Sequence, residues 1–244
     1  MIGKKSSDKH TMDYKDNEKF EVNVKNLGTV YGFFNHFDKA LASLNELGID
    51  EPISLRDLAY ARIASGPDSD VCTKPTFVRE AFVYVPHNDF GSGIYLGKSP
   101  ILRSVDEAVR ENMGIVKKKN KEGKIVEVRE EGREFYPNPD DMYNVERGTT
   151  SLGYNGSKIT IGSFLSGGDL PVSLFGEHAQ EYGELLQRNN KTGFNIWALS
   201  KDYVDTHDNS FVRPASASPL EGKWDLNGSR FLVCKEWMMG VKKV

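Results

Sequence analysis

The chain has 244 residues and a formal net charge of −3, from 32 basic and 35 acidic side chains. This length is enough for one large domain or two small ones to bury a core without disulfide bonds. The near balance of charge favours neither nucleic acid nor an anionic membrane, and no run approaches the roughly 18 apolar residues of a membrane helix. Two cysteines, Cys72 and Cys234, are too few for a disulfide framework. We therefore expect a soluble, cytoplasmic protein with free thiols, for which nucleic acid is an unlikely partner.

The first elements follow from polarity and periodicity. Residues 1–17 are polar and aperiodic, which predicts a disordered tail. Apolar and polar side chains alternate over residues 20–24, which predicts a strand. A helix is predicted over residues 31–47 and ends at Gly48. Its apolar face consists of Phe33, Phe37, Ala40, Leu44 and Leu47.

A second helix and a hairpin come next. Ser54 and Asp57 form a near capping box at the start of a helix that stops at Gly66. Prolines follow where a DNA-recognition helix would have to continue, so a helix-turn-helix is not supported. The segment 76–85 is a strong strand, and 93–97 is its expected antiparallel partner.

The stretch at residues 88–100, NDFGSGIYLGKSP, looks like part of a phosphate-binding loop. Such a loop needs a glycine, four residues, and then Gly-Lys-Ser or Gly-Lys-Thr at the start of a helix. Five residues separate Gly91 from Gly97 and three separate Gly93 from it, and a capping box places the next helix at 104–114. The glycines are therefore expected to belong to a hairpin.

The middle of the chain suggests a boundary. Lysines over residues 117–124 are followed by nearly as many glutamates, which is typical of a solvated hairpin. Residues 136–157 are rich in Pro, Asn, Asp and Gly, and the part from 141 to 157 is the expected loop or linker. It would separate an N-terminal α+β region, 18–140, from a C-terminal region, 158–244. The alternative is one continuous domain.

The C-terminal region predicts a crossover. A strand over 158–165, a helix from Leu170 and a buried strand over 193–200 have the order of a βαβ unit, whose strands are parallel. Asn227-Gly228 indicates a tight turn before a last strand at 230–237. The predicted fold class is α+β, possibly α/β. It has a mixed sheet with N-terminal helices and hairpins and one C-terminal βαβ crossover.

A parallel pair would bring two loops to one edge of the sheet, where ligands tend to bind. The first loop, 166–169, has glycines that let a ligand approach the backbone and lies at a helix N-terminus, which favours anions. Its expected ligand-binding residues are Gly167, Gly168 and Asp169. The second loop, 202–208, supplies three carboxylates and an imidazole.

Two chemistries fit the second loop. His207, oriented by Asp205, would be a general base and make this pair catalytic. Alternatively Asp202 and Asp208 would be ligands of a divalent metal. His87, on the hairpin loop, joins this site only if the two halves meet. The sequence thus predicts a protein that binds or turns over a small anionic ligand. The alternative is a non-catalytic interaction or structural protein whose loops are only solvated, and the sequence leaves open whether it is an enzyme.

Overall fold

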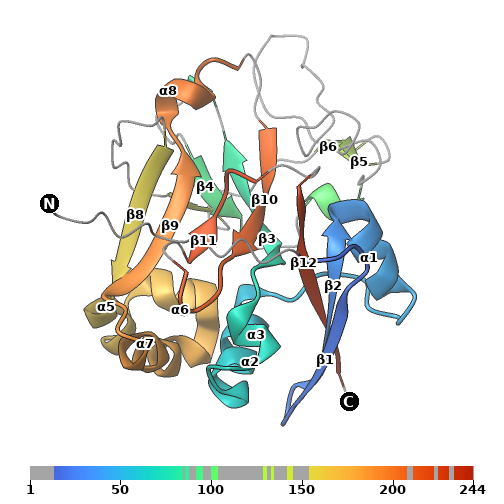
Figure 1. Cartoon of the computed structure of the whole chain (residues 1–244). Helices are drawn as coiled ribbons and strands as arrows, with labels where there is room; N and C mark the ends of the chain where they lie inside the picture. The colour runs from blue at the N-terminus through green and yellow to red at the C-terminus, as the bar shows by residue number, and fades with distance from the viewer. Residues whose placement is uncertain are drawn as a thin grey trace, which may run out of the picture.

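The centre of the computed structural model is one mixed sheet of ten strands (Figure 1). The residues described are 14–84, 86–87, 92–95, 100–103, 129–130, 133–134, 142–144, 154–207, 211–222, 225–230 and 234–243. Eight strands lie in the order β1 (Lys19–Val24), β2 (Gly28–His36), β12 (Lys235–Lys242), β3 (Thr76–Tyr84), β10 (Phe211–Ala217), β11 (Leu226–Asn227), β9 (Gly193–Leu199) and β8 (Tyr154–Thr160). β4 (Ser92–Tyr95) pairs with β3 and β7 (Met142–Asn144), while β5 (Arg129–Glu130) and β6 (Arg133–Glu134) form a separate ribbon. The α+β class with a mixed sheet is confirmed.

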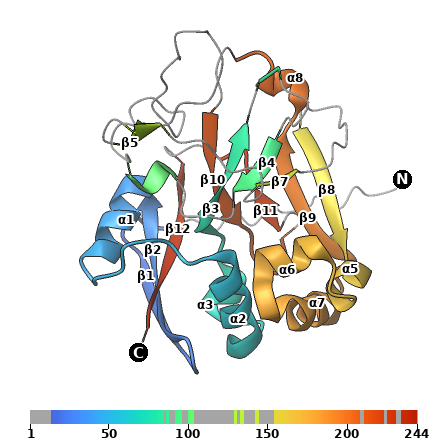
Figure 2. The same cartoon turned by 180° about the vertical axis from the view of Figure 1, so that it is seen from behind.

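Short helices surround the sheet. They are α1 (Phe37–Asn45), α2 (Leu55–Ser65), α3 (Asp70–Thr73), α5 (Ile161–Leu165), α6 (Asp169–Phe175), α7 (Ala179–Arg188) and α8 (Lys201–Val204), with 3-10 turns η1 (Pro100–Arg103) and η3 (Gly176–His178). α2, α5, α6 and α7 gather at one end of the sheet and α8 lies at the other (Figures 1 and 2). No helix within these described ranges is long and apolar enough to cross a membrane.

The sheet is buried on both faces. Along β3, Val78 and Phe82 belong to a large apolar cluster that includes α2, α6 and α7, whereas Phe77 and Ala81 belong to a smaller cluster under α1. Successive side chains of a strand point to opposite faces, so one strand supplies both clusters. This explains why β3 is buried along almost its whole length.

The start of α2 confirms the predicted cap. The Ser54 hydroxyl oxygen accepts a hydrogen bond from the N–H of Asp57 at 3.0 Å. The helix stops at Gly66, where φ is +80°. The N–H of Leu55 donates to the buried carboxylate of Glu80 at 3.0 Å, which joins the helix start to β3. The local cap and the long-range hydrogen bond therefore both fix the start of α2.

The predicted helix over 31–47 is correct only in its second part. α1 begins at Phe37, and Phe37, Ala40 and Leu44 form its buried face. Residues 31–36 belong instead to β2, which pairs with β1 on one side and β12 on the other. Two partner strands satisfy the backbone N–H and C=O groups there, and this overrides the helical spacing of the side chains.

The βαβ crossover is wrong, because β8 and β9 are antiparallel. Thr160 pairs with Gly193 at one end of the ladder and Tyr154 with Leu199 at the other. β8 stops at Thr160, whose hydroxyl oxygen accepts from the N–H of Ser163 and caps α5. The chain thus turns into helices at the end of the strand and returns beside it without crossing the sheet.

The single helix expected after Leu170 is two helices. Gly176 has φ of +59°, which ends α6 and lets α7 begin in a new direction. As a result the apolar side chains of this segment do not share one buried face: Val172 is 44% exposed, whereas Phe175 and Tyr182 are buried.

The end of the chain also differs from its prediction. β11 pairs with β9 and β10, and β12 pairs with β2 and β3, so the strands flanking Asn227-Gly228 do not form a hairpin with each other. The Asn227 carboxamide oxygen accepts from the N–H of Ser229 at 2.8 Å and makes a local turn. β4 does pair antiparallel with β3, as expected for 93–97. The predicted helix at 104–114 and the lysine run at 117–124 lie outside the described residues.

The last residues of the predicted tail make specific contacts. The N–H of Asn17 donates to the carbonyl of Phe34 at 3.0 Å, and Lys235 pairs with Asp16 at 2.7 Å. Strands from both sides of residues 141–157 belong to one sheet. The proposed division of the chain into two regions stays a prediction.

Glu80 gives a testable pH dependence. Burial raises the pKa of its carboxyl from 4.5 to about 7. Between these values the folded chain holds a proton that the unfolded chain has released, so stability is greatest below the lower value and falls as the pH rises to the upper one. The loss from this group is at most about 3 kcal/mol.

The variant Glu80→Gln keeps an oxygen acceptor for the N–H of Leu55 but does not titrate. We expect the unfolding free energy of the wild type, measured in urea, to fall by about 2–3 kcal/mol more than that of the variant between about pH 5 and pH 8. A difference between the two proteins that stays constant with pH would contradict this assignment.

Candidate functional site

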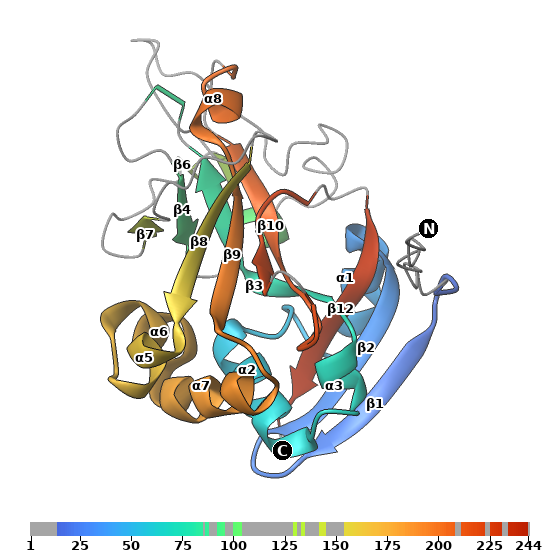
Figure 3. The same cartoon turned by 60° about the vertical axis from the view of Figure 1, so that its left-hand side comes forward.

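The structure separates the two loops that the sequence placed together. Because β8 and β9 are antiparallel, the end of β8 leads to α5 and α6, and the end of β9 leads to α8 at the opposite end of the sheet (Figure 3). Gly167, Gly168 and Asp169 therefore lie far from Asp205 and His207. The predicted shared edge does not exist.

The glycines of the first loop have a structural role. Gly167 has φ of +69°, and the N–H of Gly168 donates to the carbonyl of Ser163 at 2.8 Å. This is how a helix end satisfies its last carbonyls, so the glycines terminate α5. Asp169 occupies the first turn of α6.

The second loop is built around α8. The Ser200 hydroxyl oxygen accepts from the N–H of Tyr203 and starts the helix. One oxygen of Asp205 accepts from the N–H of His87 at 2.7 Å, and the other lies 3.0 Å from the ammonium of Lys201. The His87 N–H, followed by the Lys201 ammonium, lowers the pKa of the Asp205 carboxyl. The two halves of the chain therefore do meet at His87.

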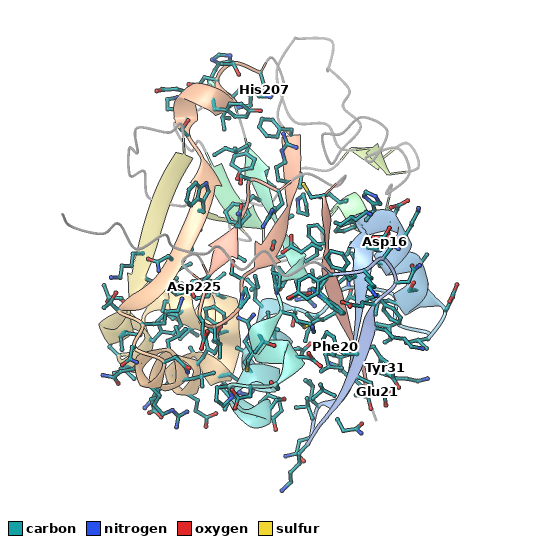
Figure 4. All side chains as sticks on the ribbon, in the orientation of Figure 1. Asp16, Phe20, Glu21, Tyr31, His207 and Asp225 are labelled. Carbon is teal, nitrogen blue, oxygen red and sulfur yellow. The ribbon has the colours of Figure 1, made fainter. Side chains whose placement is uncertain are left out.

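Rings form a continuous column from the core to α8. The centroid distances are 6.2 Å from Phe82 to Tyr84, 5.1 Å from Tyr84 to Phe211, 4.6 Å from Phe211 to His207 and 5.1 Å from His207 to Tyr203. Phe211 is paired directly with Tyr84 across β10 and β3, which fixes its position. We call these five residues the aromatic column. Its outer ring, Tyr203, is 40% exposed, and Figure 4 shows His207 beside α8.

A buried cation lies beside the aromatic column. Arg213 is 2% exposed, and its guanidinium carbon lies 5.5 Å from the centre of the Phe211 ring. Burial lowers the pKa of the Arg213 guanidinium. The nearby Tyr203, which forms a hydrogen bond with Arg213, offsets part of this shift. The Tyr84 hydroxyl donates to the carbonyl of Gly228 at 2.9 Å, and burial raises its pKa. A positive charge therefore lies under an exposed ring at this end of the sheet.

The hydrogen bonds of His207 differ from those expected for a general base that is oriented by Asp205. His207 Nδ1 lies 3.1 Å from the carbonyl oxygen of Tyr203 and 3.2 Å from the hydroxyl of Thr206. The carboxylate of Asp205 is engaged by His87 and Lys201. The orientation of His207 thus comes from its own helix turn, through a carbonyl and a hydroxyl.

Of the two predicted metal ligands, one lies among the described residues. Asp202 is exposed on α8, and Asp208 lies outside the described residues. Within the part of the chain that the structure describes, no three His, Cys, Asp or Glu side chains gather in a way that suits a metal ion. A divalent metal at Asp202 and Asp208 stays a prediction.

The sequence did not predict the buried part of the aromatic column or the buried arginine beside it. Tyr84 lies in the predicted strand 76–85, but Phe211 and Arg213 were not predicted to lie in a strand, and both belong to β10. The available signal was Arg213 itself, a charged residue inside the otherwise apolar strand FVRPASA, because arginine is almost never fully buried unless it is paired.

Comparison with known proteins establishes the architecture. No family model and no curated protein sequence matches the chain. A solved structure described as "Accommodation of massive sequence variation in Nanoarchaeota by the C-type lectin fold" is similar, with a TM-score of 0.55 and 14% sequence identity. The match covers 88% of this chain and 98% of that chain. The chain has a C-type lectin-like fold. At this identity the likeness concerns the fold alone.

The bond between Asp205 and His87 gives a second test. We expect Asp205→Ala to speed hydrogen exchange of the His87 amide at least about tenfold, because hydrogen bonds to charged groups contribute roughly 1.5–3 kcal/mol. Global stability should change by less than about 1 kcal/mol, since the pair with Lys201 is near the surface. Asp202→Ala is the matched control. Equal exchange of the His87 amide in the two variants would contradict the geometry.

Proposed function

We propose that the chain is a non-catalytic binding protein that recognises a ligand at the α8 end of its sheet. The observation that carries this proposal is the aromatic column, which runs from the buried Phe82 to the exposed Tyr203 beside a buried arginine. The C-type lectin-like fold supports a binding function for this chain. The free cysteines, Cys72 and Cys234, support the cytoplasmic location that we also propose.

The physical advantage of the aromatic column is a rigid recognition surface. Tyrosine provides a large contact area at a low cost in conformational entropy, and its hydroxyl adds a polar contact. His207 lies between Tyr203 and Phe211, so the outer ring is supported from below. A supported ring loses little freedom when a ligand packs on it.

The charge of Arg213 and the ring of Tyr203 indicate the ligand class. Arg213 is 2% exposed, so its guanidinium favours an anionic group at this surface through its positive potential and not by direct contact. We infer that the ligand carries an anionic group next to a flat or apolar face that stacks on Tyr203. This keeps the small anionic ligand predicted from the sequence but assigns it to the 202–207 turn, without the 166–169 loop.

The similar Nanoarchaeota structure is described as one whose fold accommodates massive sequence variation. We propose that here too the exposed residues of the α8 turn determine specificity, while the rings beneath hold the surface. Asp202, Tyr203 and Thr206 are exposed, whereas Phe82, Tyr84 and Phe211 are buried. Changes at Asp202 and Thr206 leave the core packing intact.

The proposal is tested by ligand screening and a matched pair of variants. A panel of sulfated, phosphorylated and carboxylated aryl compounds and oligosaccharides is screened by thermal shift, and the best probe is measured by calorimetry. We expect Tyr203→Ala to weaken binding at least about tenfold, which is about 1.4 kcal/mol. Leu165→Ala, which truncates a residue of equal 40% exposure on α5, should bind like the wild type.

Two outcomes would overturn the proposal. In the first, no compound of the panel binds at millimolar concentration. In the second, the best probe binds Tyr203→Ala and the wild type equally well.

A further inference from the structure

A hollow of about 610 Å³ lies between α1 and the ribbon formed by β1 and β2. Its lining includes Lys19 and Glu21 from β1, Tyr31 and Phe33 from β2, and Ser43 and Glu46 from the α1 side. We call it the α1 groove. It lies near the β1 end of the strand order, whereas the α8 turn follows β9 near the other end. Figure 4 shows Glu21 and Tyr31 together on this ribbon, away from His207.

The groove exists because α1 covers only part of the sheet face. The helix spans nine residues, and its buried side chains, Phe37, Ala40 and Leu44, belong to the cluster around Phe77 of β3. The β1–β2 ribbon extends beyond this contact. The rings of Tyr31 and Phe33 therefore stay half-buried and form the floor of the groove.

The strand register places a charge beside each ring. Glu21 is directly opposite Tyr31, and Lys19 is directly opposite Phe33. Directly opposed residues have their Cβ atoms about 4.5–5.5 Å apart, so each charged side chain reaches the edge of its ring. Glu46 follows α1 on the other wall, which gives the groove a carboxylate on both sides.

The carboxylates of the groove have no cation of their own. Across the described ranges, neither Glu21 nor Glu46 has an ion-pair partner within 4.0 Å, and both are exposed. Lys19 is the remaining charged side chain of the lining, so the groove has a net charge of −1 from one lysine and two glutamates. Negative charge above tyrosine is the environment that attracts an organic cation.

We propose that the α1 groove binds a small organic cation, a primary ammonium attached to an aromatic or apolar body. The ammonium lies over Tyr31 between Glu21 and Glu46, where cation–π attraction adds to two charge-assisted hydrogen bonds. The body lies on Phe33 and Leu47, which supply the apolar part of the lining. Lys19 repels the ammonium from the Phe33 end and so sets the orientation. The volume is within the usual range for small-molecule sites.

The probes are 2-phenylethylammonium and its neutral analogue 2-phenylethanol, measured by NMR titration of the full-length chain. We expect the ammonium compound to bind, with shifts at Tyr31 and Glu21, and to bind more weakly as salt is raised. The neutral compound should bind at least about tenfold more weakly, because it makes neither the ion pairs nor the cation–π contact.

The double variant Glu21→Gln/Glu46→Gln tests the carboxylates. Both side chains are exposed, so we expect the variant to fold like the wild type and its affinity for 2-phenylethylammonium to fall at least about tenfold. Glu181→Gln/Glu184→Gln makes the same charge change on the exposed face of α7 and should bind normally.

Three results would overturn the proposal: equal binding of the neutral and charged probes, unchanged affinity in the groove variant, or an equal loss in the α7 control. The last would show a general charge effect. Tyr31→Leu separates the ring from the carboxylates, and we expect it to weaken binding of the ammonium probe more than binding of the alcohol.

Discussion

The arrangement of the sheet depends on the position of one strand, β12. β12, the last strand, lies between β2 and β3, so the final residues join the N-terminal ribbon to the rest of the sheet. The N–H of Met239 donates to the Thr76 hydroxyl at 2.9 Å, and its carbonyl accepts from the N–H of Ile53 at 2.7 Å. Buried Trp237 packs against Phe20 and Phe34 on the ribbon. Within the described strands, β12 alone connects β2 to β3, so the pairing of the N-terminal ribbon with the rest of the sheet depends on it.

Local chemistry predicted the elements whose signals lie within a few residues. The cap at Ser54, the stop at Gly66 and the apolar run of β9 all appear where the sequence indicates them. Prediction failed where distant strands decide the outcome. Residues 31–36 have helical spacing, but β1 and β12 supply partners on both sides. The direction of β9 relative to β8 depends on how three helices turn, which periodicity does not encode.

The contrast between local signals and distant contacts also explains which residues of the candidate site the sequence could predict. Polar residues after a buried strand correctly indicated the α8 turn, including Asp205 and His207. Their true neighbours, Tyr84 and His87, come from β3 and the segment after it, more than a hundred residues earlier in the chain. The α1 groove was hidden for a related reason. A helix over 31–47 would not place Tyr31 opposite Glu21, and only the strand register brings the ring and the carboxylate together.

The two ends of the sheet are stabilised in different ways, and this suits the proposed binding function. At the helical end the buried guanidinium of Arg62 donates to the carbonyl of Val71, the hydroxyl of Tyr182 and the carbonyl of Ser218. One side chain thereby fixes α2, α3, α7 and the segment after β10 through neutral acceptors, and a substitution there leaves several buried groups unsatisfied. At the α8 end, exposed side chains stand on a buried column of rings. Substitutions at Asp202 and Thr206 leave the packing below unchanged, so the proposed recognition surface can vary while the fold is kept.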